Sequence, residues 1–291
     1  MGRRLAIAAA VLCAALAAMP AHARKNVVAT IAQIGEPLAV IAAGRANIVT
    51  LMGEGIDPHL YRLTRSDVAK INRADLILYN GLHLEAQMID MLDRFAARKP
   101  VVAVADTLTA NNLLPWDGRT HDPHVWMDRA NADAYFKKLS ALNTAARAAI
   151  ATIPPRARAL VTAHDAFGYF GRAYNIDVLA IQGVSTESEA GIRKIEMLVD
   201  TLVRRKISAV FIETTISERN VRALIEGAAA RGHKVAIGGA LFSDAMGAGG
   251  TYAGTYLGMF DHNVTTMVRA LGGTAPANGV GGQMAQAGEK P

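Results

Sequence analysis

Short runs of β-branched and other apolar residues alternate with longer amphipathic segments along most of this chain. Such alternation is typical of α/β proteins, in which helices join and cover the strands of a mostly parallel sheet. The expected strands are Val27–Ile31, Ile48–Met52, Leu76–Asn80 and Val101–Ala105, then Ala159–Ala163, Asp177–Ile181, Ala209–Ile212 and Val235–Ile237. The expected helices are Gln33–Ala43, Ser66–Arg73 with Ser66 as N-cap, Glu85–Ala97, Phe167–Tyr174, Glu189–Arg205, Glu218–Arg231 and Gly254–Leu271. The sequence therefore predicts two similar α/β lobes, residues 24–129 and 156–271.

A segment between these halves is rich in Ala, Leu and Lys and contains neither Gly nor Pro, Ala130–Thr152. It is predicted to form one long helix that ends at Ile153-Pro154-Pro155, so that residues 130–155 link the lobes. Because a helix is stiffer than a Gly/Ser linker, this rigid linking helix would limit hinge motion. Residues 272–291 are rich in Gly, Ala, Pro and Gln and have little to bury, so a disordered tail is expected there.

The first 23 residues have the pattern of a secretory signal. Arg3 and Arg4 precede the apolar run Leu5–Ala18, and Ala21-His22-Ala23 provides small residues at a cleavage site. A membrane anchor is the alternative, but the apolar run is shorter than the ~20 residues that span a bilayer. The sequence predicts export to the periplasm, with cleavage near Ala23.

The chain has a single cysteine, Cys13, and it lies inside the apolar run. A lipoprotein signal requires a small residue just before the cysteine, whereas Leu12 stands there, so no lipid anchor is expected. Cleavage would leave a chain without cysteine, which excludes disulfides and thiolate ligands. Any metal site must then use imidazole and carboxylate groups.

The formal charge of +6 and the pI near 9.5 raise the question of nucleic-acid binding. Lysine and arginine are scattered, however, and the one basic run, Arg204-Arg205-Lys206, ends a predicted helix, where cations satisfy the last carbonyls. No nucleic-acid partner is therefore expected.

Three histidines and one aspartate each stand in a short motif just past a predicted strand: His59, His124, His164 and Asp244. In α/β sheets, ligands bind at the loops that follow the carboxyl ends of strands. Three imidazoles and one carboxylate form a complete set of ligands for zinc. The sequence therefore predicts one metal site built from two residues of each half.

Each of these residues alone is weak evidence, because loop histidines are common and Asp244 could instead cap a helix. The case is strengthened by a carboxylate beside each histidine, Asp57, Asp122 and Asp165, since such neighbours orient metal-bound imidazoles. For Asp165, a helix N-cap is an equal alternative. Two further histidines lie near the same edge, where His83 could line the cleft and His121 could capture an ion transiently.

Several longer motifs carry a resemblance to a known family. They are Gly55–Tyr61, Asn80-Gly81, Asp122–Asp128, His164–Phe170, Gly183–Glu189, Phe211–Asn220 and Gly238–Gly258. With them the chain resembles the metal-binding solute receptors of bacterial ABC importers, the zinc/manganese type also called TroA-like. The resemblance implies a monomer with two lobes and a rigid linking helix, which clamps an ion and delivers it to a membrane permease. His59 and His124 would come from the first lobe, and His164 and Asp244 from the second.

The resemblance and the donor set together favour Zn²⁺, with a manganese (or iron) receptor of the same family as the alternative, because His164 stands where some manganese-binding relatives have glutamate. The segment between His124 and His164 is shorter than the family pattern, as if a helix were missing near residues 129–134. No histidine-rich loop is present. An exported chaperone or adhesin would have the same site.

A zinc hydrolase is the least favoured reading, because Asp244 would occupy the position that a catalytic zinc keeps for water. Glu187 and Glu213 could be offered as bases, but helix-capping or surface roles are preferred for both. The chain is therefore not expected to be an enzyme.

Overall fold

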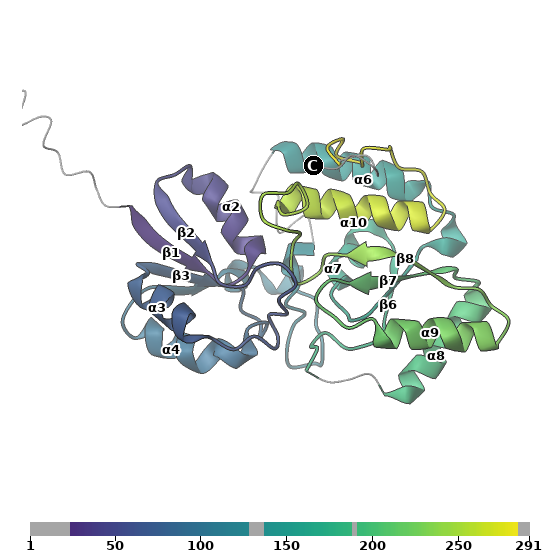
Figure 1. The fold of residues 1–291 in the computed structure, drawn as a ribbon, viewed down its shortest axis with the longest axis horizontal. Helices are drawn as coiled ribbons and strands as arrows, with labels where there is room; N and C mark the ends of the chain where they lie inside the picture. Colours follow the sequence, from purple (N-terminus) through teal and green to yellow (C-terminus); the bar gives the residue numbers. More distant parts are fainter. Residues whose placement is uncertain (1–23, 128–136, 188–190, 285–291) are drawn as a thin grey trace, which may run out of the picture.

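The computed structural model describes residues 24–127, 137–187 and 191–284, which form two α/β lobes side by side (Figure 1). The first lobe contains one parallel sheet in the order β2-β1-β3-β4. Its strands are β1 (Lys25–Ala29), β2 (Ala46–Thr50), β3 (Leu76–Tyr79) and β4 (Val101–Ala103). In the second lobe, β5 (Ala159–Thr162) pairs with β6 (Asp177–Ala180), and β7 (Ala209–Glu213) pairs with β8 (Ala236–Leu241). Both pairs are parallel and β5 lies beside β7, so the predicted fold class is confirmed.

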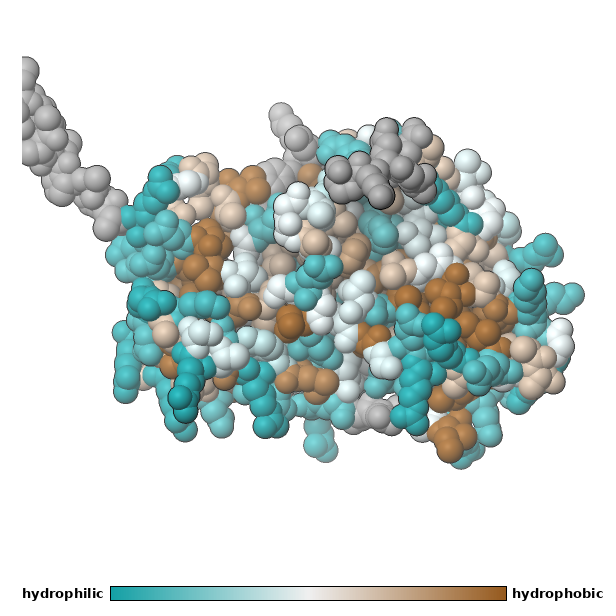
Figure 2. All heavy atoms as spheres, viewed as in Figure 1, coloured by the Kyte–Doolittle hydropathy of each residue, from teal (hydrophilic) through white to brown (hydrophobic). Residues whose placement is uncertain are grey.

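Helices cover the sheets of both lobes, as expected for an α/β fold. They are α2 (Ala32–Ala42), α3 (Arg65–Arg73), α4 (Ile89–Ala96), α6 (Lys137–Ala151), α7 (Gly168–Tyr174), α8 (Ile192–Arg205), α9 (Arg219–Ala230) and α10 (Tyr256–Ala270). None of the helices in the described part of the chain is long and apolar enough to cross a membrane. Hydrophilic side chains cover much of the face seen in Figure 2, with smaller hydrophobic patches on both lobes.

The start of α3 differs from the sequence expectation in a way that capping explains. Thr64, not Ser66, is the N-cap, and its hydroxyl accepts a hydrogen bond from the backbone N–H of Asp67 at 3.2 Å. The Asp67 carboxylate in turn accepts the backbone N–H of Thr64 at 3.0 Å. This reciprocal capping box needs an acid three residues after the cap, which Thr64 has and Ser66 lacks.

The predicted helix Glu85–Ala97 is shorter, because a single 3₁₀ turn (Ala86–Met88) precedes α4. Glu85 is fully buried and its carboxylate accepts hydrogen bonds from the Thr30 hydroxyl at 2.7 Å and from the backbone N–H of Asn80 at 2.7 Å. This carboxylate thereby ties the end of β3 to the end of β1, and the helix begins only after it.

Strand β8 runs beyond the expected Val235–Ile237 through two glycines. A Cβ on Gly238 would lie 2.8 Å from the Phe211 ring, and Gly239 has φ +146°. Glycine is therefore required for the close approach of β8 to β7 and α10, and the strand can continue to the loop that carries Asp244.

One cluster of buried apolar side chains runs through both lobes. It includes Ile31 and Ile77 of the first lobe and Phe170, Met259 and Phe260 of the second. A smaller cluster lies between α8, α9 and the second sheet. The lobes are thus packed on a shared core, which restricts their relative motion.

The predicted linking helix is described from Lys137 onward, as α6, while its expected start at Ala130 lies outside the described residues. Helix α6 packs along α10 (Figure 1), and its Asn143 side chain accepts a hydrogen bond from the Tyr174 hydroxyl at 2.7 Å. The domain boundaries proposed from the sequence, residues 24–129, 130–155 and 156–271, stay a proposal, and the first of them lies outside the described residues.

The expectation of a disordered tail does not hold for residues 272–284. The backbone N–H of Thr274 donates to the Thr152 hydroxyl at 2.7 Å, and that of Val280 donates to the Thr265 hydroxyl at 3.1 Å. The side chain of Val280 also packs against the main core. Two threonine hydroxyls, one just after the end of α6 and one in α10, thus hold a segment that has few apolar residues of its own. Residues 285–291 lie outside the described part.

Candidate metal centre

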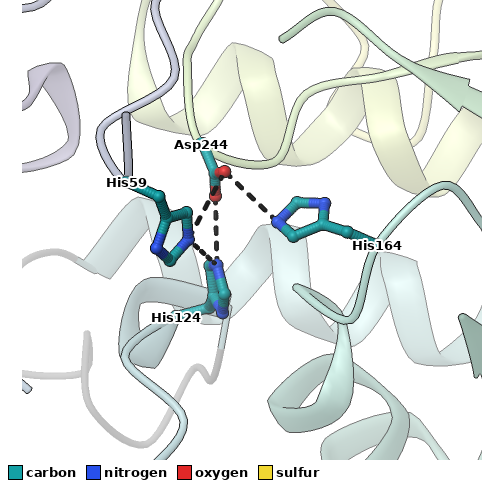
Figure 3. A group of neighbouring side chains, drawn as sticks. All are labelled: His59, His124, His164 and Asp244. Atoms are coloured by element: carbon teal, nitrogen blue, oxygen red, sulfur yellow. Dashed lines mark hydrogen bonds and ion pairs between the residues drawn. The ribbon is translucent and has the colours of Figure 1, made fainter. Parts of the chain in front are cut away.

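The four residues predicted as metal ligands meet between the two lobes (Figure 3). One ligand atom from each lies within 4.8 Å of the others. All four side chains are buried: His59 and Asp244 are 3% and 2% exposed, and His124 and His164 are 0% exposed. The structure therefore brings together residues that are far apart in the sequence and encloses them.

The four side chains reach the site from loops that follow strands, as the sequence predicted. His59 follows β2, His124 lies in the long segment after β4, His164 follows β5 and Asp244 follows β8. Because every sheet is parallel, these strand ends point toward the same edge, and the two lobes meet there.

Asp244 is at the middle of the group, and each histidine presents Nε2 to its carboxylate. Asp244 Oδ1 lies 3.2 Å from His124 Nε2, and Oδ2 lies 3.2 Å from His164 Nε2 and 3.8 Å from His59 Nε2. The Nε2 atoms of His59 and His124 are 3.3 Å apart. Three imidazole nitrogens and a carboxylate thus converge on one point.

The carboxylate of Asp244 has no hydrogen bond of good geometry to either oxygen, despite these short ion-pair distances. Burying a carboxylate without hydrogen bonds is costly unless a cation neutralises it. A divalent ion among the four atoms would supply that charge, and the His₃Asp set suits zinc-sized ions. The residues present therefore fit a bound metal ion.

Asp122 orients His124 as the sequence analysis expected. Its Oδ1 lies 2.8 Å from His124 Nδ1 and also accepts the backbone N–H of His124 at 2.9 Å. With Nδ1 committed to the carboxylate, Nε2 is left as the lone-pair donor. The edge of the Trp126 ring packs against this imidazole, with ring centroids 5.4 Å apart.

For His164 the orienting carboxylate is Glu213, not Asp165. Glu213 is 3% exposed; its Oε2 lies 2.7 Å from His164 Nδ1, and its Oε1 accepts the backbone N–H of His164 at 2.9 Å. The capping or surface role expected for Glu213 is therefore wrong. It ends strand β7, so the same strand-end rule that selected the ligands could have found it.

Neither role expected of the Asp165 side chain is found among the described contacts. The N-cap of α7 is Phe167, without a side-chain cap, and the backbone N–H of Asp165 donates to the carbonyl of Gly183. Burial raises the pKa of the Asp165 carboxyl.

The third neighbouring carboxylate, Asp57, binds the backbone of His59 and, among the described contacts, not its ring. Asp57 Oδ1 accepts the backbone N–H of His59 at 2.9 Å, while Asp57 Oδ2 accepts the hydroxyl of Thr186 at 2.7 Å. Asp57 therefore does not orient the ring, in contrast to the carboxylates beside the other two histidines.

The loop that carries Asp244 is held by the first lobe. The carbonyl of Ser243 accepts hydrogen bonds from Gln33 Nε2 at 3.2 Å and from Trp126 Nε1 at 3.1 Å. The sequence analysis missed Gln33 and Trp126, because a side chain that binds a distant backbone carbonyl has no local sequence signal. Their hydrogen bonds make the position of Asp244 depend on the contact between the lobes.

Burial and the central carboxylate have opposite effects on the histidines. Burial would lower the pKa of His124, but Asp244 and Asp122 outweigh it and raise this pKa to about 9. For His164, Glu213 and Asp244 likewise outweigh burial, so its pKa is raised well above the usual value. For His59, burial dominates and lowers the pKa to about 4. The pKa of Asp244 is well below its usual range, because His164 and His124 outweigh the effect of burial.

His83 and His121 are not part of this group. Both line a separate hollow of about 290 Å³, together with Asp106. His83 is exposed and has a left-handed backbone, with φ 63°. The structure thus separates these two histidines from the four that converge.

Comparison with known proteins agrees with this geometry. The family model described as "ZnuA: Zinc-uptake complex component A periplasmic" matches residues 27–132 and 129–270. The two matches meet within residues 129–134, where the sequence suggested a missing helix; residues 128–136 lie outside the described structure.

Curated relatives match at similar levels. The manganese-binding lipoprotein MntA of Bacillus subtilis is 42% identical, over 84% of this chain and 89% of that protein. The zinc-binding protein TroA of Treponema pallidum is also 42% identical, over 86% of this chain and 90% of that protein. The solved structure of the periplasmic zinc-binding protein TroA has a TM-score of 0.81 and covers 85% of this chain and 99% of its own.

The relatives contradict one expectation. MntA of Bacillus subtilis is named a lipoprotein, and so is ScbA of Streptococcus cristatus, which is 27% identical over 84% of this chain and 88% of that protein. The prediction of a periplasmic protein without a lipid anchor is thereby corrected. It depended on Leu12 before Cys13, and the residue at one position is a weaker criterion than lipid attachment in relatives that match along most of the chain.

Proposed function

Because this chain belongs to the zinc-uptake component family, whose members are substrate-binding components of ABC metal transporters, we propose that it captures Zn²⁺ and delivers it to a membrane permease. The ion is cargo, held between the lobes until the receptor docks. Mn²⁺ is the alternative cargo, since one of the two relatives at 42% identity is named for manganese and the other for zinc.

The proposed ligands are His59, His124, His164 and Asp244. The observation that supports them most is the enclosed convergence of three Nε2 atoms on the Asp244 carboxylate, which has no hydrogen bond of its own. Imidazole nitrogen favours zinc over manganese, because Mn²⁺ is the harder ion and is better served by oxygen. Four protein ligands also satisfy tetrahedral zinc fully, whereas Mn²⁺ commonly takes six donors.

Because four protein ligands would complete the coordination of zinc, the site favours a binding role over catalysis. A hydrolytic zinc keeps one position for water, whereas the proposed ligand Asp244 would take that position. Glu213, the base offered for a hydrolase, is instead engaged with the ring and backbone of His164. We therefore propose a receptor without enzymatic activity.

Calorimetric titration of the metal-stripped protein with Zn²⁺, followed by competition with Mn²⁺, tests this proposal. One tight zinc site is expected, lost in His124→Ala and retained in His83→Ala, which removes a histidine outside the group. Displacement of zinc by equimolar Mn²⁺ would change the cargo to manganese. Absence of stoichiometric binding of either ion would refute the receptor role.

A further inference from the structure

Three of the four proposed ligands belong to a network that joins both lobes. His124 comes from the first lobe, yet second-lobe side chains hold its segment: the Tyr169 hydroxyl donates to the carbonyl of Asp122 at 2.9 Å, and the Tyr256 hydroxyl donates to the carbonyl of Trp126. Trp126 also binds the loop that carries Asp244, and Glu213 pairs with His164. We refer to the three ligands held by these contacts, His124, His164 and Asp244, as the half-site.

The loop that carries His59 is held much less firmly. Between residues 53 and 63, one turn is closed by a backbone hydrogen bond, from the N–H of Ile56 to the carbonyl of Gly53 at 3.4 Å, and a second turn covers Pro58–Leu60. The His59 ring has no carboxylate on Nδ1, unlike the other two imidazoles. Ile56 and Leu60 on this loop are 37% and 51% exposed. Pro58 and His59 are buried, and the end of the loop is anchored by the Tyr61 hydroxyl, which donates to Asp67 at 2.7 Å. Because few backbone hydrogen bonds hold the residues before this anchor, local opening of the loop is easiest there.

A carboxylate bridge fastens this loop to the second lobe. Asp57 holds the backbone of His59 with one oxygen and the hydroxyl of Thr186 with the other. Thr186 lies in the second lobe, beyond β6. Among the described side-chain contacts, the Asp57–Thr186 hydrogen bond and the contacts of the His59 ring can hold this loop against the half-site.

A hollow lies against this bond at the boundary between the lobes. Its volume is about 240 Å³, and its lining includes Asp57 and Leu60 from the first lobe and Thr186, Ile216 and Asn220 from the second. The four ligands are themselves buried, so an ion cannot reach them unless something moves. The hollow places solvent next to the Asp57–Thr186 bond, on the route that a displaced His59 loop would open.

We infer that the Thr186–Asp57 hydrogen bond is a latch that governs exchange of the ion. When it breaks, the loop swings His59 away while His124, His164 and Asp244 stay in place, and the ion enters or leaves past Asp57. Thr186 is thus a positioning residue, which acts on the ion through Asp57 and His59. This inference rests on the proposed function, because it concerns the exchange of the proposed cargo.

Neither Asp57 nor Thr186 is among the four converging side chains, so their hydrogen bond should be about equally strong with and without the ion and gate entry and exit alike. Removing it should speed both steps and leave affinity nearly unchanged. A lost ligand would behave differently, because it weakens affinity through faster dissociation. Faster entry and exit at nearly constant affinity would therefore identify a residue that controls access of the ion. A loss of affinity would identify a residue that shapes the binding site.

The test uses Thr186→Val, which removes the hydroxyl at nearly constant shape, with Thr186→Ser as the control that keeps it. Stopped-flow mixing of the zinc-loaded chain with an excess of a fluorescent chelator gives the dissociation rate, and mixing of the metal-free chain with Zn²⁺ gives the association rate. For Thr186→Val both rates should rise by roughly tenfold, which corresponds to the free energy that one hydrogen bond to a charged group contributes. The dissociation constant should change by less than about threefold, and Thr186→Ser should resemble the parent.

Unchanged rates in Thr186→Val would overturn the latch, as would an affinity loss at an unchanged association rate. If the parent chain binds no zinc, or binds it independently of His59, the proposed function fails first and the latch falls with it. If the parent binds zinc through His59 and the variant exchanges at the parental rate, only the latch is wrong. The two failures are therefore distinguishable.

Discussion

The three histidines of the metal centre are held in different ways, and these differences set their separate contributions to binding. His124 and His164 each have a carboxylate on Nδ1, Asp122 and Glu213 respectively, which directs Nε2 toward Asp244 before an ion arrives. His59 lacks such a partner. Binding should therefore depend on the carboxylates behind the first two rings nearly as much as on the rings themselves.

Replacing Glu213 tests this dependence at a single residue. Glu213→Gln keeps the shape but removes the negative charge that pairs with His164 Nδ1 at 2.7 Å, and it places an amide NH₂ where one of two carboxylate oxygens stood. Zinc affinity should fall by roughly 10- to 100-fold, the usual cost of losing the partner of a metal-bound imidazole. Competition with a chelator of known affinity measures the change.

The matched control is Glu187→Gln, because Glu187 is exposed and its carboxylate bonds the Gln87 side chain, away from the four converging residues. It should leave affinity unchanged. Equal affinities for the two variants would mean that Glu213 does not orient His164.

The protonation of His124 predicts how binding depends on pH. Neutral imidazole binds the ion, whereas in the metal-free site the carboxylates raise the pKa of His124 to about 9. Below pH 9 the ion must therefore displace a proton, and zinc affinity should fall by up to about tenfold per pH unit for each proton displaced. His59, with its pKa lowered to about 4, is already neutral from pH 6 to 9 and adds no competition there.

Calorimetry at pH 7 in buffers of different ionisation enthalpy counts the released protons, and at least one per ion is expected. Zero release, together with an affinity that does not change between pH 6 and 8, would contradict the protonated state assigned to His124.

At the scale of elements, the strand-end rule explains why so much of the site follows from the sequence. Apolar runs marked the parallel strands, and the ligands were the metal-type side chains just past their ends. The sequence did not predict the contacts between the lobes, such as those of Trp126 with Ser243 and of Thr186 with Asp57. Their partners are set by how the lobes pack, and no local pattern encodes that. Capping errors such as Ser66 in place of Thr64 arose because the deciding acid, Asp67, lies inside the helix.

The connection between the first lobe and the Asp244 loop can be weakened without removing a ligand. Trp126→Phe keeps an aromatic ring against His124 but deletes the Nε1 donor to the Ser243 carbonyl, which leaves Gln33 as the remaining donor. Zinc affinity should fall by about fivefold, because the variant loses one hydrogen bond that contributes about 1 kcal/mol. Trp116→Phe is the control, since Trp116 is 45% exposed and makes none of these contacts. A chelator competition in which both variants equal the parent would remove Trp126 from the loop's support.

For the whole molecule, the shared core and the site between the lobes make unfolding a single event. The main apolar cluster includes residues of both lobes, and the ligands come two from each, so an ion stabilises both lobes at once. At a free zinc concentration of 100 times the dissociation constant, the added stability is about 2.7 kcal/mol. For a chain of this size that corresponds to a rise in Tm of roughly 5–10 °C.

Differential scanning calorimetry should show one transition for the metal-free protein and one, shifted upward as a whole, with zinc. His164→Ala should abolish the shift while keeping a single transition. Two transitions, of which zinc moves only one, would mean that the lobes unfold independently. Opening of the site would then be a motion of entire lobes. A single shifted transition would instead favour opening by elements that can move without breaking the shared core, such as the His59 loop.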